Sequence, residues 1–272
     1  SVSIGDLFIF FAVFYSIYFI YKLVLTRFKN FFSKLLGITS FISVIYFFFY
    51  FLWGLNYYRE PLSKNLGYQT TSYSNKELIE IYSLAKNGFN ELAKEIPQFT
   101  YKYGVAKSSL MSLFQSYNGT SGYFNPFTGE AQVNSKIPTT SLPTTTCHEM
   151  AHQIGFAAEN EANFVGFLAA LSNEDLYFKY GAYRMATRYM LFELYKRDPE
   201  QYWVLYKTIH IGVIKDFTAS SKFWNAYKNP FEPIVKKGYN AYLKSNKQQK
   251  GVDSYNYVVD LLISYFKKSV DN

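Results

Sequence analysis

The sequence predicts a mainly α-helical protein, with two N-terminal transmembrane helices followed by a mostly helical domain that holds a small β-sheet. Three observations lead to this prediction. Two long apolar runs lie within residues 1–59. Beyond them, apolar residues recur with the period of helices between Pro and Gly breaks. One short segment, 130–134, lies between Gly129 and Pro138 and is typical of a strand. We therefore divide the chain into a membrane anchor, 1–59, and a domain, 60–272.

The composition excludes a disordered chain, because 49% of the 272 residues are apolar and 21% are aromatic. The net charge of +8 arises from 28 basic and 20 acidic residues. These basic residues are scattered and form no nucleic-acid motif, so we expect no nucleic-acid partner and attribute the charge to a membrane-associated protein. The single cysteine, Cys147, excludes an intrachain disulfide and is interpreted as a small buried residue.

The two apolar runs predict membrane spans at about residues 7–25 and 35–55. Ser16 and Lys22 interrupt the first run, and the second has no charge. A signal peptide is the alternative for the first run, but no small-residue cleavage site follows it. A buried core helix is the alternative for either run, and the five aromatic residues at 47–51 disfavour it. Aromatic residues suited to a membrane interface lie near the ends of the runs: Tyr18, Tyr21, Trp53, Tyr57 and Tyr58.

The orientation follows from the connector between the runs, which carries basic residues and no acidic one. Positive loops stay in the cytoplasm, so the domain is expected on the periplasmic or external side of a bacterial inner membrane, with the lipid bilayer as a partner. The chain starts at Ser1 rather than Met, from which we expect a truncated or processed chain, with a missing earlier span as one alternative. The basic residues concerned are Lys22, Arg27, Lys29 and Lys34.

The domain begins with a linker at 60–73. Ser74 and Glu77 form a capping box, and apolar residues at helical spacing then continue until Pro97. Further helices are expected at about 159–171, 173–196, 199–215, 220–228, 231–246 and 254–268, with breaks at Asp198-Pro199 and Asn229-Pro230.

The most informative stretch is 147–155, which holds two of the three histidines. His148 and His152 are four residues apart, so on a helix both imidazoles lie on one face and can reach one ion. Glu149 lies beside them and can bind a water that the ion polarises. Gly155 then ends the helix. This pattern is the His-Glu-x-x-His signature of zinc peptidases; the alternative is an amphipathic helix with two histidines on its polar side.

A catalytic zinc ion needs a third protein ligand, and Glu159 and Glu161 are the candidates. We favour Glu159, because Asn163 follows it one helical turn later, where it can accept a hydrogen bond from a ligand histidine. Glu161 would then be an outer residue that supports the ligands or faces solvent.

Two resemblances follow from these residues. The segments HEMAH (148–152) and ENEAN (159–163) are similar to the motifs of gluzincin zinc metallopeptidases. Together with WGLNYYR (53–59) and GYFNPFTGEAQVN (122–134), they resemble a bacterial membrane-protein family, the domain of unknown function numbered 3810. The resemblance implies an integral membrane protein with a zincin-like peptidase domain and one zinc ion. The segment between His152 and Glu159 is much shorter than in thermolysin-like enzymes.

We therefore expect hydrolysis of a peptide bond in a peptide or protein substrate. Zn²⁺ held by His148, His152 and Glu159 would lower the pKa of a bound water, and Glu149 would take its proton as general base. A second donor for the carbonyl oxygen is left open among Tyr183, Arg184 and His210, although His210 is more readily explained as a structural histidine.

The strand at 130–134 is expected to be an edge strand above this site that pairs with an extended substrate. Residues 123–127 would form the loop leading into it, and Tyr123 and Gln132 would contact substrate. An ordinary two-stranded hairpin is the alternative.

The competing function is a membrane-anchored zinc-binding sensor or assembly protein without proteolytic turnover. The presence of Glu149 favours the hydrolase, because a structural zinc ion needs no base and is usually closed by four protein ligands. A pore or transporter is disfavoured, because two spans are few and neither is rich in polar residues.

Overall fold

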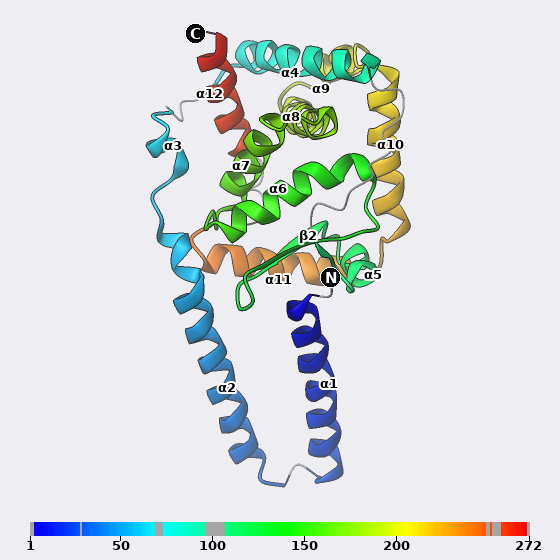
Figure 1. The fold of residues 1–272 in the computed structure, drawn as a ribbon. Coiled ribbons are helices and arrows are strands. Elements are labelled where there is room, and N and C mark those ends of the chain that lie inside the picture. The colour runs from blue at the N-terminus through cyan, green and yellow to red at the C-terminus, as the bar shows by residue number, and fades with distance from the viewer. Residues whose placement is uncertain are drawn as a thin grey trace.

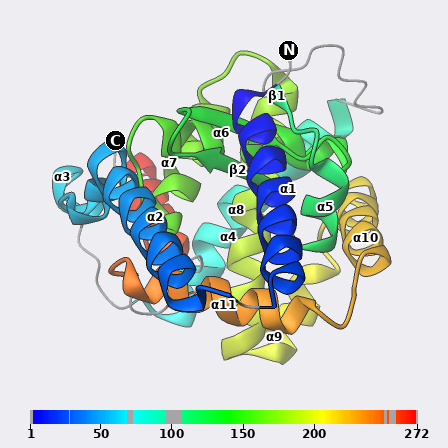
Figure 2. The same cartoon turned by 90° about the horizontal axis from the view of Figure 1, so that it is seen from below.

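The computed structural model describes residues 3–27, 29–68, 73–95, 107–248, 251 and 257–270, with the side chains of 88–95, 269 and 270 left out. Over this part of the chain the fold is mainly helical, with two apolar N-terminal helices and a small sheet, as the sequence predicts (Figure 1). Figure 1 shows α1 and α2 extending from one face of the helical domain, and Figure 2 views the molecule from that side.

Helices α1 (Ile4–Leu25) and α2 (Phe31–Leu52) are both long and apolar enough to cross a membrane. Almost all of their side chains are exposed, which distinguishes them from the buried core helices of a soluble protein. Helix α2 ends three residues before the predicted limit of the second span. The chain turns there because Trp53 and the short 3-10 helix η1 (Gly54–Tyr58) pack back against the domain.

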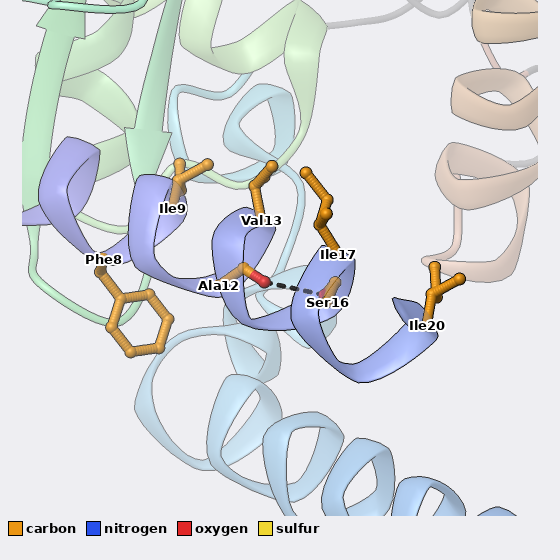
Figure 3. Close-up of a pocket in the computed structure, with 7 residues that line it drawn as sticks. All are labelled: Phe8, Ile9, Ala12, Val13, Ser16, Ile17 and Ile20. Atoms are coloured by element: carbon orange, nitrogen blue, oxygen red, sulfur yellow. Dashed lines mark hydrogen bonds between the residues drawn. The ribbon is translucent and has the colours of Figure 1, made fainter. Parts of the chain in front are cut away.

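One face of α1 carries a shallow apolar hollow of about 320 Å³ (Figure 3). Phe8, Ile9, Val13, Ile17 and Ile20 are among the residues that line it. Its single hydroxyl, on Ser16, donates a hydrogen bond to the carbonyl oxygen of Ala12 at 2.8 Å. The surface of the hollow is therefore hydrocarbon, which suits contact with lipid chains or with another apolar helix rather than catalysis.

The first turn of α1 is joined to the sheet by hydrogen bonds. The Glu130 carboxylate accepts from the backbone N–H groups of Gly5 (2.7 Å) and Ile4 (3.3 Å) and from Lys107 Nζ (2.7 Å). Buried Asp6 accepts from the Leu110 N–H at 2.6 Å. A carboxylate beside a helix N-terminus is favourable because the free N–H groups there carry partial positive charge.

The sheet has three described strands: β1 (Lys107–Ser108), β2 (Gly122–Asn125) and β3 (Glu130–Val133). Their order is β1-β3-β2, with β1 parallel and β2 antiparallel to β3. The prediction that 130–134 forms an edge strand is wrong, because β3 pairs with β2 on one side and with β1 on the other. Residues 123–125, which were predicted to lie in a loop, belong to β2 instead. Strands β2 and β3 form an antiparallel hairpin over 122–133, which was the alternative prediction.

The helical domain packs around five helices: α4 (Asn75–Glu95), α6 (Leu142–Gln153), α7 (Glu159–Leu171), α8 (Leu176–Arg197) and α12 (Val258–Val270). The capping box of α4 is confirmed, with Ser74 N–H to Glu77 Oε2 at 2.7 Å and Glu77 N–H to Ser74 Oγ at 3.2 Å. The largest fully buried side chains form the shared core: Tyr82, Phe164, Phe167, Met190, Leu194 and Leu262.

The remaining helices are short or peripheral: α3 (Leu62–Asn65), α5 (Ser112–Tyr117), η2 (Thr139–Ser141), α9 (Pro199–Tyr206), α10 (Ile211–Ala226) and α11 (Glu232–Ser245). The single helix predicted at 199–215 is wrong, because the chain breaks between α9 and α10. Ile209 is buried at this break and His210 caps α10 by accepting a hydrogen bond from the Gly212 N–H. The helix predicted at 220–228 is the end of α10.

Candidate metal site

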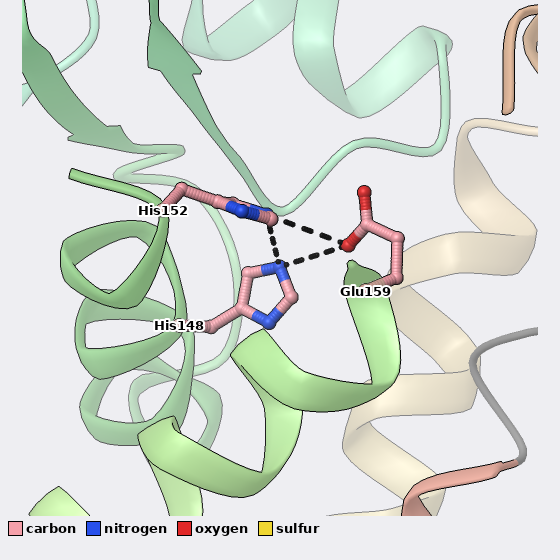
Figure 4. A group of neighbouring side chains, drawn as sticks. All are labelled: His148, His152 and Glu159. Carbon is pink, nitrogen blue, oxygen red and sulfur yellow. Dashed lines mark hydrogen bonds and ion pairs between the residues drawn. The ribbon is translucent and has the colours of Figure 1, made fainter. Parts of the chain in front are cut away.

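The two histidines of α6 face each other across one helical turn. Pro143 occupies the first turn of the helix, where its missing N–H costs no hydrogen bond. Four residues separate His148 from His152, and their Nε2 atoms lie 3.1 Å apart with the rings nearly perpendicular (Figure 4). Both imidazoles therefore direct one nitrogen at the same point, as the spacing predicts.

Glu159 reaches this point because the chain reverses between α6 and α7. Gly155 has a φ of +95°, a value that side-chain-bearing residues rarely adopt. Helix α7 then packs closely on α6, since a Cβ at Gly166 would lie 2.9 Å from the backbone nitrogen of His148. The Glu159 Oε2 atom ends 3.2 Å from His148 Nε2 and 3.5 Å from His152 Nε2 (Figure 4).

These three atoms match the ligand sphere of a small divalent cation. They come from three residues whose ligand atoms all lie within 4.8 Å of one another. Zinc bonds of about 2.0–2.1 Å in tetrahedral geometry place ligand atoms about 3.3 Å apart, close to the separations found. Glu159 Oε2 is also buried and accepts no hydrogen bond from the residues that the structure describes. A buried carboxylate oxygen without a hydrogen bond, facing two imidazole nitrogens, fits a cation between them.

The ligands are oriented by neighbouring groups. His152 Nδ1 lies 2.7 Å from the carbonyl oxygen of Phe156, so this nitrogen carries the proton and Nε2 is free to bind a metal. The Tyr239 hydroxyl donates to Glu159 Oε1 at 2.8 Å. Trp53 Nε1 donates to the His152 carbonyl oxygen at 3.0 Å, which ties the end of α2 to the site.

The carboxyl group of Glu149 lies beside the cluster and is almost fully buried, with 4% of the residue exposed. Burial raises the pKa of this carboxyl above its ordinary value, and His148 and His152 oppose the increase. Strand β2 makes room for the group, because a Cβ at Gly122 would lie 2.7 Å from Glu149 Oε1. Glu149 is therefore a buried carboxyl group next to the candidate ligands.

The charges of the cluster favour a cation at its centre. Burial lowers the pKa of His152, but Glu159 outweighs burial and raises it to about 9. Burial raises the pKa of Glu159, but His152 and His148 hold it well below its ordinary value. The carboxylate is therefore ionised and the histidines face a negative charge, so the centre attracts positive charge from protons or from a metal ion.

Two residues expected to support the ligands have other contacts. Glu161 lies on α7 near Glu159 but accepts a hydrogen bond from the Leu62 N–H at 2.6 Å, at the start of α3. Asn163 donates to the Tyr189 hydroxyl at 3.2 Å, and His148 Nδ1 has no hydrogen-bond partner among the described residues. The expected hydrogen bond from a ligand histidine to Asn163 is therefore wrong, because Asn163 faces α8 rather than α6.

The candidate oxyanion donors belong to other parts of the domain. Tyr183 packs against the core. Arg184 is buried above the Phe217 ring, with its guanidinium carbon 5.6 Å from the ring centre. His210 caps α10. None of these contacts involves the metal cluster, and a catalytic role of the three residues stays a prediction.

The two predicted substrate contacts on the sheet are also engaged elsewhere. The Tyr123 hydroxyl donates to Asp6, and Gln132 is fully buried against Ser3. Both residues therefore support the docking of α1 onto the sheet.

Several residues around the cluster were missed by the sequence analysis. Tyr239 reaches it from α11. The hydroxyl of Tyr242, on the same helix, lies 3.1 Å from that of Tyr57 on η1. With 27 tyrosines in the chain, no sequence signal separates these from the others. A better signal existed for Trp53 and Gly122, which lie in the segments that carry the family resemblance.

The fold and site thus define a mainly helical protein with two apolar N-terminal helices and a His148, His152 and Glu159 cluster that could hold a metal ion. The chain belongs to the family described as "Protein of unknown function (DUF3810)", whose model matches residues 1–85 and 80–263. No curated protein and no solved structure matches it.

Proposed function

We propose that this protein is a membrane-anchored, zinc-dependent peptidase related to the gluzincins. One observation carries the proposal: the two Nε2 atoms and Glu159 Oε2 lie 3.1–3.5 Å apart, with the buried Glu149 carboxyl beside them. Two histidines, a carboxylate and an adjacent glutamate are the groups that metal-assisted hydrolysis requires.

His148, His152 and Glu159 would hold the metal. When bound, zinc supplies a Lewis acid that lowers the pKa of a water molecule and polarises a carbonyl group. Glu149 takes the proton from the attacking water and then delivers it to the leaving amine nitrogen. Burial, which raises the pKa of Glu149, suits a group that must both accept and return a proton.

The substrate backbone would pair with β2 rather than with β3. Strand β2 is an edge strand of the described sheet and meets Glu149 at Gly122. An extended peptide added along this edge would bring its carbonyl groups near the base. This moves the expected substrate-binding edge by one strand.

For the second donor to the carbonyl oxygen, we propose the hydroxyl of Tyr239. It donates to Glu159 Oε1 at 2.8 Å, so its proton would have to shift from this carboxylate oxygen to the oxyanion as the negative charge develops there. A neutral phenol can donate to a developing oxyanion without adding charge to the site.

The two apolar helices would anchor the protein, with their connector in the cytoplasm. Their exposed apolar side chains and 22-residue lengths match the hydrocarbon core of a bilayer. The basic residues at the connector support the orientation, and the domain would then lie on the periplasmic or external side.

The proposal is tested by metal analysis and peptide-library cleavage with the purified full chain. Glu149→Gln is expected to retain about one zinc ion per chain and to lose activity by about 100-fold to 10,000-fold. Glu159→Gln is expected to lose the metal. Glu161→Gln is the matched control, because Glu161 lies two residues after Glu159 on the same helix. This variant should keep both metal and activity.

A zinc-binding sensor or assembly protein is the second candidate function. A wild-type chain that binds zinc fully and cleaves no member of the library would favour it over the peptidase. Equal activity of wild type and Glu149→Gln would also contradict the peptidase mechanism.

A further inference from the structure

Helix α11 (Glu232–Ser245) contributes almost nothing to the core. Leu243 is its single buried residue. Phe231 at its N-cap and Ile234 in its first turn are 70% and 69% exposed, and Val235 is also exposed. Apolar side chains of this size are rarely left together in water, so this face is expected to have a partner.

The position of α11 indicates which partner this is. Figure 1 shows α11 lying crosswise at the base of the domain, at the level where α1 begins. Helix α5 (Ser112–Tyr117) lies at the same level, with Leu113 and Phe114 exposed. The Asn229 side chain, just before α11, donates to the Tyr117 carbonyl oxygen at 2.8 Å and links the two. The apolar surface of α1 and α2 therefore continues onto α5 and α11.

The charge of α11 agrees with a membrane surface. Residues 228–248 carry five lysines and one acidic residue, Glu232. All five lysines are exposed: Lys228, Lys236, Lys237, Lys244 and Lys247. Two of them, Lys228 and Lys236, border a shallow hollow of about 540 Å³ at the start of the helix. An amphipathic helix with apolar residues on one side and lysines on the other is typical of helices that lie on anionic bilayers.

We propose that α11 lies in the membrane interface, with Phe231, Ile234 and Val235 at the boundary between headgroups and acyl chains. Its lysines contact anionic lipid headgroups. This inference rests on the proposed membrane anchoring by α1 and α2, and it does not require the protein to be a peptidase. Because Tyr239 of α11 donates to Glu159, the candidate metal site would lie one side chain away from a helix held at the bilayer surface.

The test uses the full chain in nanodiscs with single labelled cysteines on a Cys147→Ala background. Ile234→Cys reports on α11. Val204→Cys is the matched control, because Val204 is a 59% exposed apolar residue on α9, at the end of the domain away from α1 and α2 (Figure 1). Phe14→Cys, in the middle of α1, reports on the anchor itself. The fluorescence of each label is quenched by brominated lipid or by aqueous iodide.

Brominated lipid is expected to quench the label at Ile234 at least about twofold more than the label at Val204, with the order reversed for iodide. Equal quenching at the two positions would overturn the inference while leaving the anchor intact, provided that Phe14 is quenched by lipid. A label at Phe14 that lipid does not reach would overturn the anchor as well. Protection of Ile234 from both quenchers would show that protein, such as a second copy of this chain, covers α11 instead.

The role of the lysines is tested with the lipid composition. Nanodiscs of phosphatidylcholine with phosphatidylglycerol are expected to increase lipid quenching at Ile234 relative to phosphatidylcholine alone, and Lys236→Gln with Lys237→Gln should remove the increase. Equal quenching in the two compositions would overturn the assignment of these lysines to anionic headgroups.

Discussion

The two carboxylate oxygens of Glu159 have different surroundings, and this difference organises the site at the scale of single residues. Oε2 faces the two imidazole nitrogens, and Oε1 accepts the Tyr239 hydrogen bond at 2.8 Å. A hydrogen bond to the outer oxygen fixes the direction of the inner one. Groups that orient a metal ligand in this way influence metal affinity without touching the ion.

Tyr239→Phe is therefore expected to weaken zinc binding by about 10-fold to 100-fold, measured by competition with a chelator of known affinity. Tyr242→Phe is the matched control, because its hydroxyl contacts Tyr57 rather than a ligand. Equal zinc affinity of wild type and Tyr239→Phe would contradict a role for Tyr239 in orienting Glu159.

Gly122 makes a second prediction at this scale. An alanine Cβ there would lie 2.7 Å from Glu149 Oε1 and 2.8 Å from the Gln132 carbonyl oxygen. Gly122→Ala should therefore displace the Glu149 carboxyl, abolish hydrolysis and leave zinc bound, with a loss of about 1–3 kcal/mol in the free energy of unfolding. Gly238→Ala is the control, since its Cβ would meet nothing within 4 Å. Full activity of Gly122→Ala would show that Glu149 does not need its position against β2.

At the scale of elements, α1 is held to the sheet by a polar junction. Burial raises the pKa of Glu130, but Lys107 and the first N–H groups of α1 outweigh burial and lower it to about 2. The folded-state pKa lies below the ordinary value of the carboxyl. Glu130 therefore stabilises the junction at neutral pH, and this contribution is lost as the pH falls through about 4.5 to about 2.

Glu130→Gln is thus expected to lower the unfolding temperature at pH 7 and to reduce the difference in unfolding temperature between pH 7 and about pH 3. The measurement is a thermal melt of the full chain in nanodiscs at several pH values. Glu200→Gln, at an exposed carboxylate in the first turn of α9, is the control. A melting temperature that depends on pH equally in wild type and Glu130→Gln would contradict the role of this carboxylate.

At the scale of the whole molecule, the candidate metal site lies directly beyond the end of α2. Trp53 follows the last residue of that helix and donates to the backbone of His152. Figure 1 shows the connector between α1 and α2 at the end of the molecule away from α6. A bilayer crossed by both helices would therefore separate the basic connector from the site.

This arrangement makes a prediction for topology in bacterial cells. A cysteine introduced at Lys222, exposed on α10, should react with a membrane-impermeant maleimide in intact spheroplasts. A cysteine at Lys29 in the connector should react only after the membrane has been permeabilised. Both are placed on the Cys147→Ala background. The reverse labelling pattern would place the domain in the cytoplasm.

The local features of this protein are determined by its sequence. Alternation of helix-forming and breaking residues predicts most helices, the Ser74 capping box forms as expected, and the four-residue spacing of His148 and His152 directs both rings to one point. Each of these depends on residues within a few positions of one another, so the rules of a single helix are sufficient.

Tertiary structure decided what depends on contacts between distant segments. The central position of β3 depends on β1, which is two residues long and carries no strand signal of its own. Tyr239 meets Glu159 across 80 residues, and Asn163 turns to Tyr189 because α7 packs between α6 and α8. Such contacts are set by how whole helices pack, and the residue types involved are too common in this chain to mark them in advance.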